Sequence, residues 1–250
     1  MFSPSASIYD AIYSFKDYAA EAESVHELVQ ARKPGAETLL DVACGTGAHL
    51  AELRRSYRCV GLDLDPALLE VARGRLQGVE LLEGDMRDFD LGRRFDAVVC
   101  MFSSIGYVQG ADELRRAVAA MARHLEPGGV LVVEPWLSPD RIELPHVGAV
   151  FVDEPELKIA RIDTVEVEGN RSILELHYLV GTPERVEQFT ERHELTLFTV
   201  EEMLDAFRAA GLDVEHDPEG GPMGRGLYVD VASLDVGTPT SLPDASAGGP

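Results

Sequence analysis

The sequence predicts an α/β fold built on a doubly wound, mainly parallel sheet with an antiparallel β insertion. Three observations support this. Apolar strands alternate with helices between residues 39 and 134, a glycine-rich turn follows the first strand, and residues 151–198 switch to the alternating apolar and polar pattern of strands. Strands and helices that alternate at this spacing form parallel sheets through right-handed crossovers.

The first strand, residues 39–42, runs into the turn that contains Gly45 and Gly47, and a helix is expected over residues 49–57. Glycine allows backbone conformations that a side chain blocks, and it lets a ligand lie against the chain. Asp41 puts a negative charge at the turn and no lysine follows Gly47, so a phosphate loop is disfavoured. A cationic ligand such as S-adenosylmethionine (SAM) fits better. The motif DVACGTG resembles the SAM-binding loop of class I methyltransferases, whose fold is Rossmann-like.

The second strand ends at Asp63 and Leu64, about 20 residues after the glycine turn, where doubly wound folds place an acid on a ribose. The two oxygens of one carboxylate can accept both hydroxyl protons of the diol. We therefore expect Asp63 at the ribose. Asp65 and Pro66 have the character of a helix cap and first helical residue, so Asp65 is structural.

The third strand, residues 79–83, leads into Asp85 and Met86. An acid here can accept from the adenine amino group while the next backbone N–H meets a ring nitrogen, and we expect this pair to hold the adenine. Asp88 could equally be a solvated acidic turn. A fourth strand (95–102), a helix (112–125), a turn (126–129) and a fifth strand (130–134) follow. Each candidate lies at the carboxyl end of a strand, where such sheets bind ligands.

The segments outside this core differ in pattern. Before the first strand, one or two helices are expected, and their Tyr9 and Tyr13 could form a lid or belong to the core. In the insertion, Gly169-Asn170 predicts a hairpin turn. A helix (200–211) and strands near Val214 and over 227–231 would complete the main sheet. The predicted domains are N-terminal helices with the SAM-binding core (1–135), an antiparallel substrate lobe (136–198), completion of the core sheet (199–233) and a disordered tail (234–250).

Composition indicates a cytoplasmic enzyme with a small-molecule substrate. The 250-residue chain has a formal net charge of −22, which opposes binding to nucleic acid. The sequence has no run of about 18 apolar residues and no basic segment before an apolar one, so neither a membrane span nor a signal peptide is expected. Cys44, Cys59 and Cys100 lack metal-ligand spacing and are expected to be buried thiols in a reducing compartment, so no metal is predicted.

Several longer motifs are more specific than the glycine turn. They are KDY at 16–18, GDMRDF at 84–89, MFSSIGY at 101–107, EPW at 134–136 and GGPMGRGL at 220–227. On these the chain, up to about residue 231, resembles the dTDP-amino-sugar N,N-dimethyltransferases of macrolide biosynthesis that make dTDP-desosamine and dTDP-mycaminose. The resemblance implies SAM-dependent N-methylation, in the form of N,N-dimethylation, of a dTDP-linked deoxyamino sugar in antibiotic biosynthesis. A homodimer is compatible with the sequence, which does not fix the number of subunits or the position of the amine.

The resemblance also implies roles for residues. Tyr18 should hold the SAM carboxylate, and the Ala43 and Met101 carbonyls its amino group. Arg225, between two glycines, resembles the family's arginine for the nucleotide diphosphate, and a bidentate charged contact suits that role. Tyr107 lies where the family has Tyr or His near the sugar amine and is the catalytic candidate. The family's N-terminal tyrosine has its nearest match in Phe2, which lacks the hydroxyl.

Two sets complete the candidates. The cofactor set is Tyr18, Ala43, Gly45, Gly47, Asp63, Leu64, Asp85, Met86 and Met101. The substrate set is Ser104, Glu134, Trp136, His177 and Arg225. Trp136 could instead pack between lobes, and His177 and His193 could be ordinary strand histidines.

Two other functions are considered. One is a methyltransferase acting on another small amine or hydroxyl, and the other is a non-catalytic SAM-binding module. The complete MFSSIGY segment and an intact Asp63 argue against the second.

Overall fold

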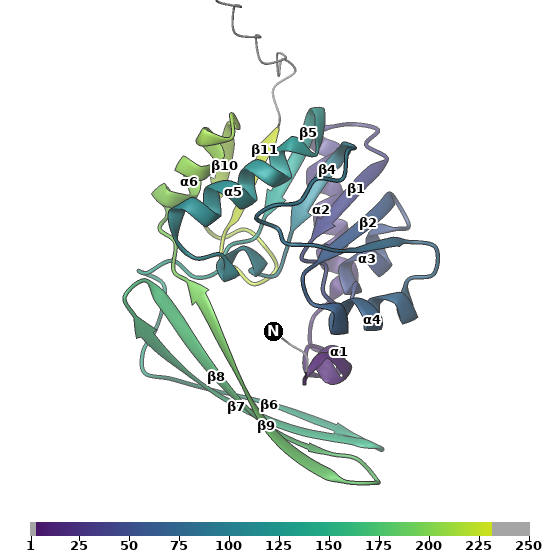
Figure 1. Ribbon diagram of the computed structural model, residues 1–250, viewed down its shortest axis with the longest axis vertical. Coiled ribbons are helices and arrows are strands. Elements are labelled where there is room, and N and C mark those ends of the chain that lie inside the picture. The colour runs from purple at the N-terminus through teal and green to yellow at the C-terminus, as the bar shows by residue number, and fades with distance from the viewer. Residues whose placement is uncertain (1–3, 232–250) are drawn as a thin grey trace, which may run out of the picture.

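The computed structural model describes residues 4–231. Phe2 and the tail expected from residue 234 onward lie outside the described residues. The chain forms a seven-stranded main sheet in the order β10-β11-β5-β4-β1-β2-β3 and a four-stranded sheet in the order β6-β7-β8-β9, called sheet B below (Figure 1). The predicted α/β fold with an antiparallel insertion is confirmed, whereas the exact domain limits stay a prediction.

The main sheet is parallel through its first five strands, and β11 pairs antiparallel with β5 and β10. Its strands are β1 (Thr38–Val42), β2 (Arg58–Asp63), β3 (Glu80–Glu83), β4 (Phe95–Cys100), β5 (Leu125–Val133), β10 (Val214–Asp217) and β11 (Leu227–Val231). Along β4, Ala97 and Val99 belong to one apolar cluster while Val98 and Cys100 belong to the other. Apolar side chains on both faces explain the continuous apolar strands of the sequence.

Helices cover both faces of this sheet. On one face lie α2 (Tyr18–Arg32), α3 (Ala48–Leu53) and α4 (Pro66–Arg75), and on the other lie α5 (Gly110–Arg123) and α6 (Val200–Ala209). Their starts follow the local sequence. Asp65 caps α4 by accepting from the Ala67 N–H at 2.9 Å, as predicted, and Thr199 with Glu202 forms a capping box on α6.

Sheet B is an antiparallel meander of β6 (His146–Glu154), β7 (Leu157–Glu168), β8 (Arg171–Gly181) and β9 (Val186–Thr196). The hairpin predicted at Gly169-Asn170 is confirmed, because Glu168 pairs with Arg171 and Gly169 has φ +62°. The N-terminal elements η1 (Ala6–Ile8) and α1 (Tyr9–Ile12) pack on the inner face of sheet B through Ile8 and Ile12. Sheet B lies below the main sheet in Figure 1, with α1 between the two on one side.

The turn predicted over residues 126–129 is wrong, because this stretch belongs to β5. Phe95 pairs with Leu125 but Ala97 pairs with Val130, so a β-bulge absorbs the extra residues. Gly129 permits this, since a Cβ there would lie 2.8 Å from the Glu126 carbonyl oxygen. No helix within residues 4–231 combines the length and the apolar character that crossing a bilayer requires.

Candidate functional site

A cavity of about 760 Å³ opens where the carboxyl ends of the parallel strands face sheet B. Ligand pockets in proteins measure roughly 300–1,000 Å³. Ten of the residues predicted from the sequence line this cavity: Ala43, Gly45, Asp63, Leu64, Asp85, Met86, Ser104, Tyr107, Trp136 and Arg225. A single enclosure therefore brings together the residues expected at the cofactor and those expected at the substrate.

Asp63 forms one end of the cavity at the tip of β2 and is 7% exposed. One carboxylate oxygen accepts from the Gly45 N–H at 2.7 Å, and the other accepts from the Asp65 N–H at 2.8 Å. Burial raises the pKa of Asp63, while these two hydrogen bonds oppose the rise. Each oxygen keeps a second lone pair, so the carboxylate can still accept from two hydroxyl groups.

The glycine turn reaches the cavity through left-handed backbone. Ala43 has φ +62° and Gly45 has φ +56°. No atom lies within 4 Å of the position that a Gly45 Cβ would take, so the backbone there faces open space. Gly47 does not line the cavity. A Cβ on Gly47 would lie 2.4 Å from Cδ1 of Leu76, so this glycine allows α3 and α4 to pack closely.

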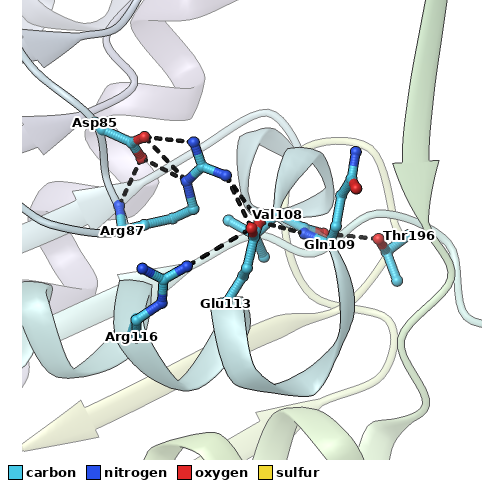
Figure 2. A network of polar contacts seen from close by, with 7 residues as sticks. All are labelled: Asp85, Arg87, Val108, Gln109, Glu113, Arg116 and Thr196. Carbon is cyan, nitrogen blue, oxygen red and sulfur yellow. Dashed lines mark hydrogen bonds and ion pairs between the residues drawn. The ribbon is translucent and has the colours of Figure 1, made fainter.

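Asp85 and Met86 line the cavity next to Asp63, and an arginine holds the Asp85 side chain. Figure 2 shows Arg87 between two acids: its guanidinium contacts Asp85 at 2.5 Å and both oxygens of Glu113 at 3.0 Å. Glu113 also accepts from the Gln109 backbone N–H at 2.8 Å. The network ties the Asp85 loop to the start of α5. The first cause of the lowered Asp85 pKa is its hydrogen bond from Arg87, so Asp85 remains an acceptor.

The sequence predicts that Asp41 places a negative charge at the glycine turn, and the structure differs. The structure buries the carboxyl group at 2% exposure, and within the described residues its Oδ2 has no hydrogen-bond partner. Burial, with a smaller contribution from Asp63, raises the pKa of Asp41 to about 8. The acid that faces the cavity is therefore Asp63.

We expect the Asp41→Asn variant to gain more stability at high pH than at low pH. Between the ordinary pKa near 4 and the folded value of about 8, the folded state holds the extra proton, so wild-type stability falls as pH rises. The gain in unfolding free energy should be about 3 kcal/mol larger at pH 8 than at pH 5, measured by urea unfolding. The exposed Asp88→Asn variant is the control. Equal gains at both pH values would show that Asp41 titrates normally.

Two predicted cofactor residues, Tyr18 and Met101, lie outside the wall of the main cavity. Tyr18 packs edge-on against His49, with the ring centres 4.9 Å apart. Met101 lines a neighbouring hollow of about 440 Å³ together with Lys16 and Glu21. Lys16 Nζ lies 2.9 Å from Glu21 and 3.9 Å from the centre of the Phe102 ring. This hollow adjoins the end of β4 and shares Phe15 and Met223 with the lining of the main cavity.

Arg225 lies at the sheet B end of the cavity with its guanidinium fixed by neutral groups. It donates to the Ser103 hydroxyl at 2.9 Å and stacks 4.3 Å from the centre of the Trp136 ring. Ser103 in turn donates to the Pro135 carbonyl at 2.7 Å. Among residues 4–231, no carboxylate forms an ion pair with Arg225. Burial lowers the pKa of this arginine, as expected for a cation without a close counter-ion.

Glu134, predicted in the substrate set, lies behind this wall and is fully buried at 0% exposure. It accepts from the Phe102 N–H at 2.7 Å. Phe102 and Ser103 both have positive φ, +52° and +63°, which is strained for residues other than glycine. Glu134 therefore holds a strained turn that places Ser103 beneath Arg225.

Tyr107 ends the short helix η2 (Ser104–Tyr107) and points its hydroxyl at His193 Nδ1, 3.0 Å away. Gly106 permits the close approach of η2 to its surroundings. A Cβ at that position would lie 2.8 Å from Trp136 Cβ and 3.1 Å from Leu195 Cδ2. Tyr107, Trp136 and β9 are thus held in contact.

His177 does not reach the cavity. It lies on the outer face of sheet B, where it pairs with Glu175 at 2.8 Å, because Leu176 and Tyr178 take the inward positions of β8. The sequence interpretation missed several cavity residues, namely Arg141, Arg161 and His146, and left Tyr9, Tyr13 and His193 open. The sequence signal for Arg161 was its position: it lies on the same, inward face of β7 as the apolar residues Ile159 and Val165.

The residues present fit SAM as a cofactor. Asp63 offers paired acceptor oxygens in the position expected for a diol, Asp85 and Met86 adjoin it, and the open space at Gly45 admits a ligand against the backbone. Among residues 4–231, no cluster of His, Cys, Asp or Glu has the geometry of a metal site.

Comparison with known proteins gives concordant results. The model of a methyltransferase domain matches residues 39–129. The dTDP-3-amino-3,4,6-trideoxy-alpha-D-glucopyranose N,N-dimethyltransferase of Streptomyces venezuelae is 48% identical over 230 residues, which cover 90% of this chain and 97% of that protein. The dTDP-4-amino-2,3,4,6-tetradeoxy-D-glucose N,N-dimethyltransferase of Saccharopolyspora spinosa is 44% identical, covering 92% of this chain and 94% of that protein.

Solved structures agree. The crystal structure of Streptomyces venezuelae DesVI superimposes with a TM-score of 0.88 at 48% identity, covering 91% of this chain and 98% of that one. SAM-bound CalS10, an amino pentose methyltransferase of Micromonospora echinaspora involved in calicheamicin biosynthesis, gives a TM-score of 0.83 at 43% identity, covering 90% of this chain and 97% of that one.

Proposed function

Because the chain belongs to the dTDP-amino-sugar N,N-dimethyltransferases, a family of SAM-dependent class I methyltransferases, we propose that it N-methylates a dTDP-linked deoxyamino sugar in antibiotic biosynthesis. The reaction that we propose is N,N-dimethylation, carried out in two rounds. The support from the site is its continuous cavity, which holds acceptors at one end and a partly buried cation at the other.

Arg225 is the observation that carries the substrate assignment. In a chain of net charge −22, a partly buried guanidinium without an ion-paired carboxylate among the described residues favours an anionic ligand. The stack on Trp136 and the bond to Ser103 leave part of its fork of donors for oxygens of a diphosphate. Arg141 and Arg161 line the same cavity and add positive charge, although Arg161 is paired with Asp163 at 3.1 Å.

At the other end we assign Asp63 and Leu64 to the ribose of SAM, Asp85 and Met86 to its adenine, and the backbone of Ala43 and Gly45 to the side of the bound cofactor. Met101 would serve its amino acid end from the adjoining hollow, and Tyr18, next in the chain to the lining residue Asp17, would do so from beside it. When bound, SAM supplies an electrophilic methyl group, so the acceptor amine has to be unprotonated at the moment of methyl transfer. The chain contributes mainly alignment, which can supply roughly 7–11 kcal/mol toward the barrier.

The proposal is tested by incubating the purified protein with SAM and either a dTDP-amino sugar or simple amines. We expect mono- and then dimethylated sugar nucleotide, with S-adenosylhomocysteine formed in step. Methylation of simple amines alone would leave a methyltransferase with another substrate, and no S-adenosylhomocysteine with any acceptor would favour a binding module.

Tyr107→Phe should keep substantial activity, because water can remove the proton of an amine near its own pKa. We expect the variant to retain more than about a tenth of wild-type kcat at pH 9 in a steady-state methyl-transfer assay. An obligatory general base contributes roughly 10²–10⁴-fold. A fall to background at that pH would therefore show that Tyr107 is such a base.

We also propose a cytoplasmic location, supported by free thiols at Cys44, Cys59 and Cys100. The homodimer stays a prediction. It is supported by the outer face of sheet B, where Val147 and Phe151 are 73% and 71% exposed.

A further inference from the structure

Sheet B carries Glu-x-His pairs on two neighbouring strands, and the two pairs differ in environment. Glu175 and His177 of β8 lie on the exposed outer face, 2.8 Å apart. Glu191 and His193 of β9 lie on the inner face at 5% and 3% exposure, directly behind Tyr107. The Tyr107 hydroxyl in the cavity, the His193 imidazole and the Glu191 carboxylate therefore form a row of titratable groups, and methyl transfer by alignment alone gives this row no role.

The direction of the hydrogen bonds along this chain follows from Glu191. Its carboxylate accepts from the Ser5 backbone N–H at 3.0 Å and from the Ser5 hydroxyl at 2.9 Å, and it faces His193 Nε2 at 3.5 Å. A carboxylate only accepts, so in the neutral imidazole of His193 the proton lies on Nε2 and Nδ1 is the acceptor nitrogen. The Tyr107 hydroxyl then donates to Nδ1 at 3.0 Å, and its oxygen keeps lone pairs that can accept from a group in the cavity.

The protonation states suit this direction. Burial raises the pKa of Tyr107 well above its usual value, and Tyr13 and Glu191 add to the rise, so Tyr107 stays a neutral phenol. Burial alone would raise the pKa of Glu191, but hydrogen bonds from His193 and Ser5 hold that pKa below its usual value. Tyr178 and Asp63 also raise the pKa of Tyr107, and Tyr9 interacts with Tyr107 electrostatically.

One hydrogen bond between residues close to Tyr107 and His193 in the chain fixes the relative position of the two side chains. Thr196 of β9 donates from its hydroxyl to the carbonyl of Val108 at 2.7 Å (Figure 2). Val108 follows Tyr107, and Thr196 lies three residues after His193. This bond holds η2 and β9 together beside the Tyr107 hydroxyl and the His193 imidazole.

We propose that Tyr107, His193 and Glu191 form a proton relay that deprotonates the acceptor amine in the cavity, an inference that rests on the proposed function. An ordinary aliphatic amine is mostly protonated at pH 7. Its ammonium N–H proton passes to the Tyr107 oxygen while the Tyr107 hydroxyl proton passes to His193 Nδ1. The amine keeps its electron pair, the phenol is restored, and the new imidazolium is paired with Glu191. After the product leaves, His193 returns its proton to the Tyr107 oxygen, and the Tyr107 hydroxyl releases its own proton to water, which resets the relay. His193 and Glu191 are positioning residues that act through Tyr107.

The test is the pH profile of kcat/KM for a dTDP-amino sugar between pH 6 and 9.5. His193→Asn keeps a hydrogen-bonding group near the Nδ1 position but cannot take up the proton, and Glu191→Gln removes the charge that stabilises the imidazolium. We expect both variants to lose about tenfold or more at pH 6.5 and to return to within about twofold of wild type at pH 9. Glu175→Gln, which changes the exposed pair, should follow wild type throughout.

A loss that is equal at every pH, or no loss at all, would overturn the relay and leave His193 a structural residue. Thermal unfolding and dTDP binding of each variant identify a folding defect. If His193→Asn does not fold, Tyr107→Phe has to show the same loss of kcat/KM at low pH. A Tyr107→Phe variant without that loss overturns the proposal. A wild-type protein that methylates no amino sugar contradicts the proposed function, whereas a normal wild type with unshifted variants contradicts the relay alone.

Discussion

Arg225→Ala is expected to weaken the binding of dTDP by about 30-fold or more, since hydrogen bonds to charged groups contribute roughly 1.5–3 kcal/mol. The variant removes a partly buried cation that already contacts Trp136 and Ser103, so little ordering of the side chain is needed when an anion binds. Isothermal titration with dTDP measures the effect directly.

Two variants sharpen this experiment. Arg225→Lys keeps the charge but loses the planar fork and the stack, so its affinity should fall between those of wild type and the alanine variant. Arg115→Ala removes an exposed arginine that pairs with Asp112 on α5 and should bind dTDP normally. If dTDP gives no heat with wild type, or binds Arg225→Ala as tightly as wild type, the assignment of a dTDP-linked substrate is lost.

Asp63→Asn is expected to weaken the binding of SAM or S-adenosylhomocysteine by about a hundredfold, although the two side chains have the same shape. Both carboxylate oxygens already accept backbone N–H groups, from Gly45 and from Asp65. An amide has one acceptor oxygen and one donor nitrogen, so either orientation sets an N–H₂ group against one of these donors. The turn and the contact with the ribose are then weakened together.

The matched control is Asp65→Asn. Asp65 caps α4 by accepting from the Ala67 N–H, and asparagine caps helices about as well as aspartate. Titration calorimetry of both variants should show a large loss only for Asp63→Asn. Equal affinity in the two variants would show that Asp63 does not contact the cofactor.

The sequence predicted the main sheet well because its signals are local. Continuous apolar strands, the glycine turn and the acids at the strand ends depend on neighbours in the chain, and the parallel order follows from connection rules. The same locality explains the placement of Asp63 and Asp85 in one cavity. It also explains the error at residues 126–129, because only pairing with β4 draws Gly129 into a strand.

Sheet B was harder to interpret, because the face on which a strand residue lies depends on the register of its neighbours. His177 and His193 look alike in isolation. The alternation nevertheless separates them, since Leu174, Leu176 and Tyr178 take one face of β8 and leave His177 on the other. On β9 the inward set includes Leu195, which places His193 inside. The hydrogen bond that Arg225 donates to the Ser103 hydroxyl joins residues far apart in the chain, and no local pattern reveals it.

The N-terminal segment touches both walls of the cavity. Asp10 accepts from the Thr46 hydroxyl of the glycine turn at 2.7 Å, and Ser5 is bound to Glu191 of sheet B. Ser5 is bound to the same carboxylate that faces His193. If the segment moved away, Glu191 would lose both hydrogen bonds from Ser5 and would be held less firmly beside His193.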